Sequence, residues 1–433
     1  MGVSAVLNRG QTMPEKRYKR LKTAEELQRL MQWHYTGLRL PRLGRKLAWV
    51  TSGAPVEILR AMGVLVAYPE NYGALCGAQH QAVPLCQAAE AQGYSPDLCS
   101  YARSSLGSIL QPGQAPMNGL PRPDLLIACN NICGTVIKWF EAVARLYNVP
   151  LFILDTPFIH DELSSPILDY VLAQLQEMIR FVEGATGNRL SLERLKRVAN
   201  ASNETVRLWS EIRGLCKARP SPLNAPDLFV NMAPIVVLRG TQGAVRFYRH
   251  LKAEVEERVS AGVGAIPQEK YRLLWDNIAV WHHLYRFYSY FTDYGACFVV
   301  DSYTGGWSQE IPTGDLLQGA ATAYATVFLN QSLEHRAEMM VRLIAEYRVD
   351  GFVMHSNRSC KPYSLGQYAI KRAVSERTGV PGLLIESDMC DSRAFAAEPV
   401  KTRIQAFMET LSVLHPASSA RPVPPNSPTG AGF

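Results

Sequence analysis

The sequence predicts an α/β protein of two domains, each a parallel sheet flanked by helices, joined by a helical segment. Short apolar runs of strand length alternate with amphipathic helices across residues 45–164, and the alternation returns across residues 261–414. Between them, residues 165–260 show almost only helical periodicity. A chain of 433 residues also exceeds what one ordinary hydrophobic core holds. Alternating strands and helices imply parallel strands linked by right-handed crossovers.

The first α/β domain, residues 45–164, follows an N-terminal helical arm, residues 1–44, in which residues 23–38 have helical spacing. Its strands are expected at residues 46–51, 64–68, 124–128 and 149–155, and its helices at residues 56–62, 73–91 and 134–147. Pro69, Glu70 and Asn71 interrupt the pattern, so we expect a break there.

The helical connector, residues 165–260, contains three long amphipathic pieces, at residues 168–182, 191–212 and 244–258. In the second α/β domain, residues 261–414, strands are expected at residues 271–275, 296–301, 351–354 and 381–386, and helices at residues 281–290, 333–347, 365–376 and 400–414. The tail, residues 415–433, is rich in Pro, Ser, Gly and Ala and is expected to be disordered.

The composition favours a globular protein of the cytoplasm. No apolar run is long enough to span a bilayer, and the first residues lack the apolar segment of a signal peptide. We therefore expect no membrane partner. The net charge of +7 is spread along the chain except at residues 16–20, a basic run that we interpret as a solvated arm, so no nucleic-acid partner is expected. The same charge suits a polyanionic small ligand such as a nucleotide or a coenzyme A ester.

Several common chemistries find no support because their motifs are absent. The sequence contains no phosphate-binding P-loop and no G-x-G-x-x-G after a strand. It also contains no G-x-S-x-G elbow of a serine hydrolase, no H-E-x-x-H of a zinc protease and no C-x-x-C pair.

Three of the nine cysteines share one setting. Cys99, Cys129 and Cys360 each lie at or just past the end of an extended or strand-like run and precede polar residues. Strand ends from two α/β units can converge on one cleft, where three thiolates could hold an iron–sulfur cluster with a fourth position open. Cys133, at the start of a helix, competes with Cys129 as a ligand. Spacing alone favours the alternative that these are ordinary buried thiols.

Two polar segments follow the last two expected strands. Residues 355–364 hold His355, Arg358, Lys361 and Tyr363 beside Cys360, and residues 386–393 hold three carboxylates, among them Asp388. Ligands of open α/β sheets bind at the carboxyl ends of the strands, so both segments are candidate site loops. For the acidic segment, a loop that caps a helix is an equally good interpretation.

These same segments carry a family resemblance. His-Ser-Asn-Arg-Ser-Cys-Lys-Pro-Tyr-Ser-Leu-Gly-Gln from His355, then Glu-Ser-Asp-Met-Cys-Asp-Ser-Arg from Glu386 and residues 402–407, resemble the benzoyl-CoA reductase/2-hydroxyacyl-CoA dehydratase family. The resemblance extends back through residues 124–155 and 97–103 and covers about residues 45–414. It reverses the preference for ordinary buried thiols.

The resemblance implies a [4Fe-4S] cluster held by Cys99, Cys129 and Cys360, with an exchangeable fourth position. It implies a paralogous, cluster-bearing partner subunit, a separate ATP-hydrolysing iron–sulfur activator and a ferredoxin upstream of that activator. A low-potential electron would make a ketyl-type radical anion of the acyl-CoA substrate. His355, Tyr363 and Asp388 are then candidate proton donors, and Arg358 and Lys361 candidate contacts for coenzyme A phosphates or for the cluster charge.

Within that family, the chain looks more like the larger cluster-bearing subunit of the ATP-dependent reductase. Three features favour this subunit: the length of the chain, the run Cys-Lys-Pro-Tyr-Ser and the aromatic side chains of residues 275–290. That subunit would reduce the ring of an aromatic acyl-CoA, benzoyl-CoA, to a cyclic diene in anaerobic aromatic degradation. One alternative is a dehydratase subunit that eliminates water from a 2-hydroxyacyl-CoA. A non-catalytic alternative is a cluster-bearing scaffold on which the activator docks.

Overall fold

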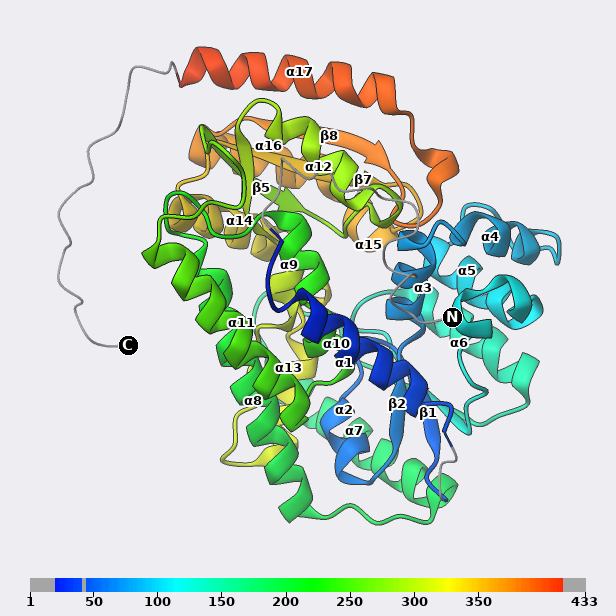
Figure 1. The fold of residues 1–433 in the computed structure, drawn as a ribbon. Coiled ribbons are helices and arrows are strands. Elements are labelled where there is room, and N and C mark those ends of the chain that lie inside the picture. The colour runs from blue at the N-terminus through cyan, green and yellow to red at the C-terminus, as the bar shows by residue number, and fades with distance from the viewer. Residues whose placement is uncertain (1–19, 41–43, 416–433) are drawn as a thin grey trace.

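Two parallel sheets form the framework of the molecule. The structure is a computed structural model, and it describes residues 20–40 and 44–415. The basic residues 16–19 and the expected tail beyond residue 415 lie outside the described residues. The first sheet has the strand order β2-β1-β3-β4 and the second the order β6-β5-β7-β8. Figure 1 shows the second sheet above the first, with α17 running across the top. The predicted α/β fold with parallel sheets and flanking helices is confirmed.

Both sheets have the same topology. Each places its first two strands side by side and adds its last two strands on the other side of the first, so that every neighbouring pair is parallel. The strands are β1 (Leu47–Val50), β2 (Leu65–Ala67), β3 (Leu125–Cys129), β4 (Leu151–Leu154), β5 (Tyr271–Asp276), β6 (Ala296–Asp301), β7 (Gly351–Asn357) and β8 (Gly382–Ser387). The central strands β1 and β3 are buried along their whole length, as expected for a sheet covered on both faces.

Helices surround the two sheets and fill the middle of the chain. In the first half these are α1 (Ala24–Gly37), α2 (Val56–Ala61), α3 (Pro69–Ala78), α4 (Ala82–Glu90), α5 (Ser100–Leu110) and α6 (Gly134–Tyr147). The middle contains α7 (Ser165–Thr186), α8 (Leu192–Leu215), α9 (Ala225–Asn231), α10 (Ala233–Val237) and α11 (Gln242–Ser260). The second half contains α12 (Leu284–Thr292), α13 (Leu316–Ala325), α14 (Leu333–Tyr347), α15 (Lys361–Ser364), α16 (Gln367–Thr378) and α17 (Ala397–Leu414). None of the described helices combines the length and apolarity needed to cross a bilayer.

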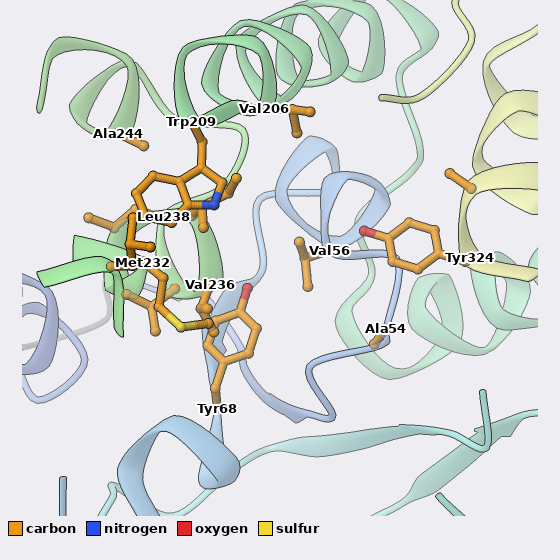
Figure 2. Close-up of a cluster of buried hydrophobic side chains, with 14 of the residues drawn as sticks. Ala54, Val56, Tyr68, Val206, Trp209, Met232, Val236, Leu238, Ala244 and Tyr324 are labelled. Carbon is orange, nitrogen blue, oxygen red and sulfur yellow. The ribbon is translucent and has the colours of Figure 1, made fainter. Parts of the chain in front are cut away.

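The helices of the middle segment pack against α2 and against the residues that follow β2 in the first half of the chain. Figure 2 shows Trp209 of α8 pointing toward Met232 and Leu238, with Val56 of α2 nearby and Tyr68, just after β2, at the other side of the cluster. The same hydrophobic cluster continues to Phe352 in β7 of the second sheet. Residues from both sheets and from the middle helices therefore share one continuous apolar core.

Three local expectations differ from the structure. The break expected at Pro69 is wrong, because Pro69 occupies the first turn of α3, where its missing N–H costs nothing. The helix α5 was not expected, since four serines and Gly107 weaken its helical pattern. β7 continues through His355 to Asn357, so these polar residues belong to a strand and not to the loop after it.

Close packing of α4 against α5 depends on Gly107. A Cβ added there would lie 1.9 Å from the carbonyl oxygen of Leu85, a backbone atom that cannot rotate away. Gly107→Ala should therefore lower the free energy of unfolding by about 1–3 kcal/mol through overpacking, measured by chemical denaturation. Gly184→Ala in α7 is the matched control, because nothing lies within 4 Å of its added Cβ. Equal stability of the two variants would contradict the packing argument.

Candidate functional site

One cavity of about 1060 Å³ lies between the carboxyl ends of the two sheets. Every strand except β4 is followed, within five residues of its end, by a residue that lines this cavity. These residues are Ser52 and Gly53 after β1, Glu70 after β2, Ile132 and Cys133 after β3, Ile278 and Trp281 after β5, Tyr303 and Gly306 after β6, Ser359 and Cys360 after β7, and Met389 after β8. Parallel sheets bind ligands at this edge, and here two such edges face one space.

Three cysteines line the cavity, and each lies at the N-cap of a helix. Cys99 precedes α5, Cys133 precedes α6 and Cys360 precedes α15. The Cys133 sulfur accepts the backbone N–H of Thr135 at 3.2 Å. All three thiols are partly exposed, whereas the other six cysteines are buried. We call Cys99, Cys133 and Cys360 the thiol triad.

Burial and helix ends act in opposite directions on the pKa of two of these thiols, Cys99 and Cys360. Burial raises the pKa of Cys99 well above its ordinary value, and the neighbouring Cys360 and Cys133 raise it further. Burial likewise raises the pKa of Cys360 to about 12, with Cys133 as the next cause. Backbone N–H groups in the first turns of α5 and α15 lower the pKa of Cys99 and Cys360. Without a cation, the Cys99 and Cys360 thiols are therefore protonated at neutral pH.

The thiol triad fits an iron–sulfur cluster by its donor chemistry. Three sulfur donors from three segments reach one apolar cavity, and each is backed by a helix N-terminus that favours negative charge. In the described ranges, no three His, Cys, Asp or Glu side chains lie close enough to share a single metal ion. In a cluster, each thiolate binds a different iron, so its ligands need not share one ion.

Cys129, one of the three expected cluster ligands, lies elsewhere. It is the last residue of β3, fully buried, and it packs in the hydrophobic cluster on the face of the first sheet opposite to Ala128. Burial raises the pKa of its thiol to about 12. Cys129 does not line the cavity, whereas Cys133, the expected competitor, does.

Two of the expected proton donors do not reach the cavity. His355 is 1% exposed in β7, and its Nδ1 contacts the carbonyl oxygen of Ile278 at 2.8 Å, which assigns the proton to that nitrogen. Burial lowers the pKa of His355 to about 4, so the ring is neutral at pH 7. Asp388 is also 1% exposed, and it does not line the cavity. Its carboxylate accepts the Ser359 hydroxyl and the backbone N–H groups of Cys390 and Asp391.

Tyr363 and Lys361 do line the cavity, directly after Cys360. Tyr363 is 1% exposed, and its hydroxyl has no hydrogen-bond partner among the described residues. The Arg336 guanidinium lies 5.0 Å from the centre of its ring. Lys361 is exposed, whereas Arg358 points to solvent and lies 3.4 Å from Glu386. Of the two expected cationic contacts, Lys361 therefore lines the cavity and Arg358 does not.

Glu70 is a cavity carboxylate that the sequence interpretation passed over. It lies in the first turn of α3, and one of its oxygens accepts the backbone N–H of Ser52, which follows β1. Burial raises the pKa of Glu70, and the bond from Ser52 lowers it to a smaller extent. The signal that could have revealed it was the pair Pro69-Glu70, because proline at the first helical position followed by an acid is typical of a helix start.

Aromatic side chains form another part of the cavity wall. The indole N–H of Trp281 donates to the hydroxyl of Tyr101 at 2.6 Å, across the two halves of the chain. The ring of Phe229 lies 6.3 Å from that of Trp281 and 6.3 Å from that of Tyr303. Burial raises the pKa of both Tyr101 and Tyr303, so their hydroxyls stay neutral and can donate hydrogen bonds.

Comparisons with known proteins agree with this site. A family model described as 2-hydroxyglutaryl-CoA dehydratase, D-component, matches residues 51–411. The chain is 36% identical to the (R)-2-hydroxyisocaproyl-CoA dehydratase alpha subunit of Clostridioides difficile, over 85% of this chain and 90% of that protein. It is 32% identical to the (R)-phenyllactyl-CoA dehydratase alpha subunit of Clostridium sporogenes, with the same coverage. It is 30% identical to a benzoyl-CoA reductase subunit of Thauera aromatica, over 82% of this chain and 85% of that protein.

The raised pKa of Glu70 makes a testable contribution to stability. A carboxyl whose folded-state pKa lies above its unfolded value stabilises the fold at low pH, and this contribution is lost as pH rises through the folded value. Glu70→Gln should therefore gain stability relative to the parent protein as pH rises from about 4 to 8, measured by chemical denaturation at each pH. Glu398→Gln, at a carboxylate with an 81% exposed side chain, is the control. A Glu70→Gln difference that falls with rising pH would contradict the burial argument.

Proposed function

This chain belongs to the 2-hydroxyglutaryl-CoA dehydratase D-component family, whose members include 2-hydroxyacyl-CoA dehydratase and benzoyl-CoA reductase subunits, and on that premise we propose that it is the cluster-bearing subunit of a 2-hydroxyacyl-CoA dehydratase. The observation that carries the proposal is the thiol triad, three N-capping cysteines in one cavity that also contains the carboxyl group of Glu70. The two dehydratase relatives described above support this branch.

The proposed ligands of a [4Fe-4S] cluster are Cys99, Cys133 and Cys360. This set replaces Cys129 by Cys133, because the Cys129 side chain packs in the core away from the cavity. When bound, the cluster would supply single electrons at low potential. The three helix N-termini offset the negative charge of the thiolates, and the aromatic wall limits the access of water.

Glu70 is the proposed proton-transfer group. Elimination converts a 2-hydroxyacyl thioester into an enoyl thioester and water: the hydroxyl leaves C2, a proton leaves C3, and the reaction is redox-neutral overall. Because burial raises the pKa of the Glu70 carboxyl, this group is better suited than an exposed carboxylate to exchange a proton with substrate, and it can accept the C3 proton or protonate the leaving hydroxyl. Ser52 fixes one carboxyl oxygen through its N–H. Tyr363, with a buried hydroxyl that lacks a partner among the described residues, is a proposed donor to the thioester oxygen.

Reduction of an aromatic acyl-CoA is the second candidate, and it was the first expectation from the sequence. The observation that favours it is the aromatic wall of Tyr101, Phe229, Trp281 and Tyr303, which suits a flat ring. An aromatic 2-hydroxyacyl group would fit the same wall, so this wall favours a large apolar acyl group in either reaction.

The proposed assembly follows from the same family membership. The relatives are each named as one subunit of a dehydratase or a reductase, which supports a second, related subunit beside this chain. We propose that electrons come from a separate ATP-hydrolysing iron–sulfur protein with a ferredoxin upstream. Nine free cysteines favour a reducing compartment, the cytoplasm.

The ligand assignment predicts the result of a cysteine series. Cys99→Ala, Cys133→Ala and Cys360→Ala should each lose most of the iron and sulfide of the anaerobically reconstituted protein, because each removes one thiolate from the set. Cys129→Ala is the matched control and should keep about four irons per chain. Iron retained by Cys133→Ala and lost by Cys129→Ala would assign the ligand to Cys129 instead.

The reaction itself is tested by anaerobic turnover of the complete enzyme with activator, ATP and reductant. We expect an enoyl-CoA from a 2-hydroxyacyl-CoA with a large apolar side chain, and Glu70→Gln should lower kcat by about 100-fold or more as a proton-transfer variant. Formation of a cyclic diene from benzoyl-CoA, with the 2-hydroxyacyl-CoA untouched, would assign the reductase reaction. If only the cluster of the partner protein responded to substrate, this chain would be a scaffold.

A further inference from the structure

The acidic segment after β8 lies behind two of the three thiol-bearing loops. We call residues 388–393 the clamp loop. Of its residues, only Met389 lines the cavity, and Asp388 and Asp391 are 1% and 5% exposed. Its two carboxylates nevertheless make several hydrogen bonds and ion pairs with other protein groups. These carboxylates therefore have a role other than contact with substrate.

Asp388 connects the clamp loop to both Cys360 and Cys99. One carboxylate oxygen accepts the hydroxyl of Ser359, the residue before Cys360. The same Ser359 oxygen accepts the backbone N–H of Ser100, the residue after Cys99, at 3.0 Å. The other Asp388 oxygen accepts the N–H groups of Cys390 and Asp391, both at 2.9 Å. A single chain of hydrogen bonds therefore joins two loops that are 259 residues apart in sequence.

Asp391 makes a second connection to the Cys99 side. The Arg103 guanidinium lies 2.9 Å from the Asp391 carboxylate and 2.6 Å from that of Glu90. The Nε of Arg103 donates to the carbonyl oxygen of Leu98, the residue before Cys99, at 2.9 Å. Arg393 closes this network by pairing with both Asp391 and Glu90 at 2.6 Å. The side chain of Arg103 is only 3% exposed, so water screens these pairs weakly.

We infer that Asp388, acting through Ser359, is a positioning residue that fixes the distance between Cys99 and Cys360 and thereby the fit of an iron–sulfur cluster in the thiol triad. The inference rests on the proposed function, since it presumes that the triad holds a cluster. It assigns the acidic segment a role in holding metal ligands in place rather than in proton transfer. Partners that orient metal ligands commonly change metal affinity by about 10–100-fold when they are replaced.

The geometry favours positioning over catalysis for a physical reason. The Asp388 residue is nearly inaccessible, and its carboxylate accepts three hydrogen bonds from Ser359, Cys390 and Asp391. Ser359 lies between the carboxylate and the cavity and uses its one hydroxyl proton to bond Asp388, while its lone pair receives the Ser100 N–H. Loss of the Ser359 hydroxyl leaves one Asp388 oxygen and the Ser100 N–H without their partner, and it removes the direct hydrogen-bonded link between the two loops.

The test uses Ser359→Ala, Asp388→Asn and the double variant, with Ser108→Ala as the matched control. Ser108 is also buried in α5, and its hydroxyl donates to the Ser105 carbonyl within the same helix at 2.7 Å. Ser359→Thr keeps the hydroxyl and serves as the rescue variant. Each protein is reconstituted anaerobically with iron and sulfide, and iron release to a chelator is measured beside the thermal unfolding of the metal-free protein.

We expect Ser359→Ala and Asp388→Asn to release iron about 10–100-fold faster than Ser108→Ala. The double variant should release iron no faster than Ser359→Ala alone, because the inference has Asp388 act on the two loops through the Ser359 hydroxyl. Ser359→Thr should restore slow release, and metal-free unfolding should match that of Ser108→Ala. Release as slow as in the control, or additive effects, would overturn the inference. If the metal-free variants unfolded at a lower temperature and also released iron faster, Asp388 would be a residue that stabilises the fold, and the inference would be wrong. A parent protein that takes up no iron would instead sink the proposed function.

Discussion

The site depends on one geometric constraint, the meeting of two parallel sheets at their carboxyl ends. In each sheet, the parallel order sends every strand end, and the start of the helix that follows, to the same edge. Because the two edges face one cavity, helix N-termini from distant parts of the chain converge there. Cys133 and Cys360 lie at the starts of the helices that follow β3 and β7, and Cys99 lies at the start of α5, the third helix after β2, so the fold supplies both the sulfur donors and a favourable field for their negative charge.

In the cavity, the unfavourable free energy of burying negative charge opposes the favourable interaction of that charge with helix N-termini or with a bound cation. Burial makes a free thiolate unfavourable at Cys99 and Cys360, and it also keeps Glu70 protonated to higher pH. A cationic metal centre reverses the balance for the thiols, since bound thiolates no longer carry uncompensated charge. Behind the cavity wall, Asp388 bonds the cavity-lining Ser359, and through Ser359 it connects the loops of Cys360 and Cys99.

Much of the framework could be predicted from the sequence, because buried parallel strands read as short apolar runs. Every strand lies where such a run was expected. The site was harder: Cys129 and Cys133 are four residues apart, and only the strand end and the helix start show that one enters the core and the other the cavity. Glu70 was passed over because proline reads equally as a break or a helix start. Asp388 was recognised by type, but its burial depends on loops distant in sequence.

We propose that Cys99, Cys133 and Cys360 together hold an iron–sulfur cluster in the cavity between the sheets. Anomalous diffraction at the iron absorption edge, from anaerobically grown crystals of the reconstituted protein, tests it most directly. We expect anomalous density for a cluster bonded to these three sulfur atoms and facing Glu70. Iron density bonded to Cys129, or a cavity without iron in a protein that retains its activity, would show that these three cysteines are not the cluster ligands.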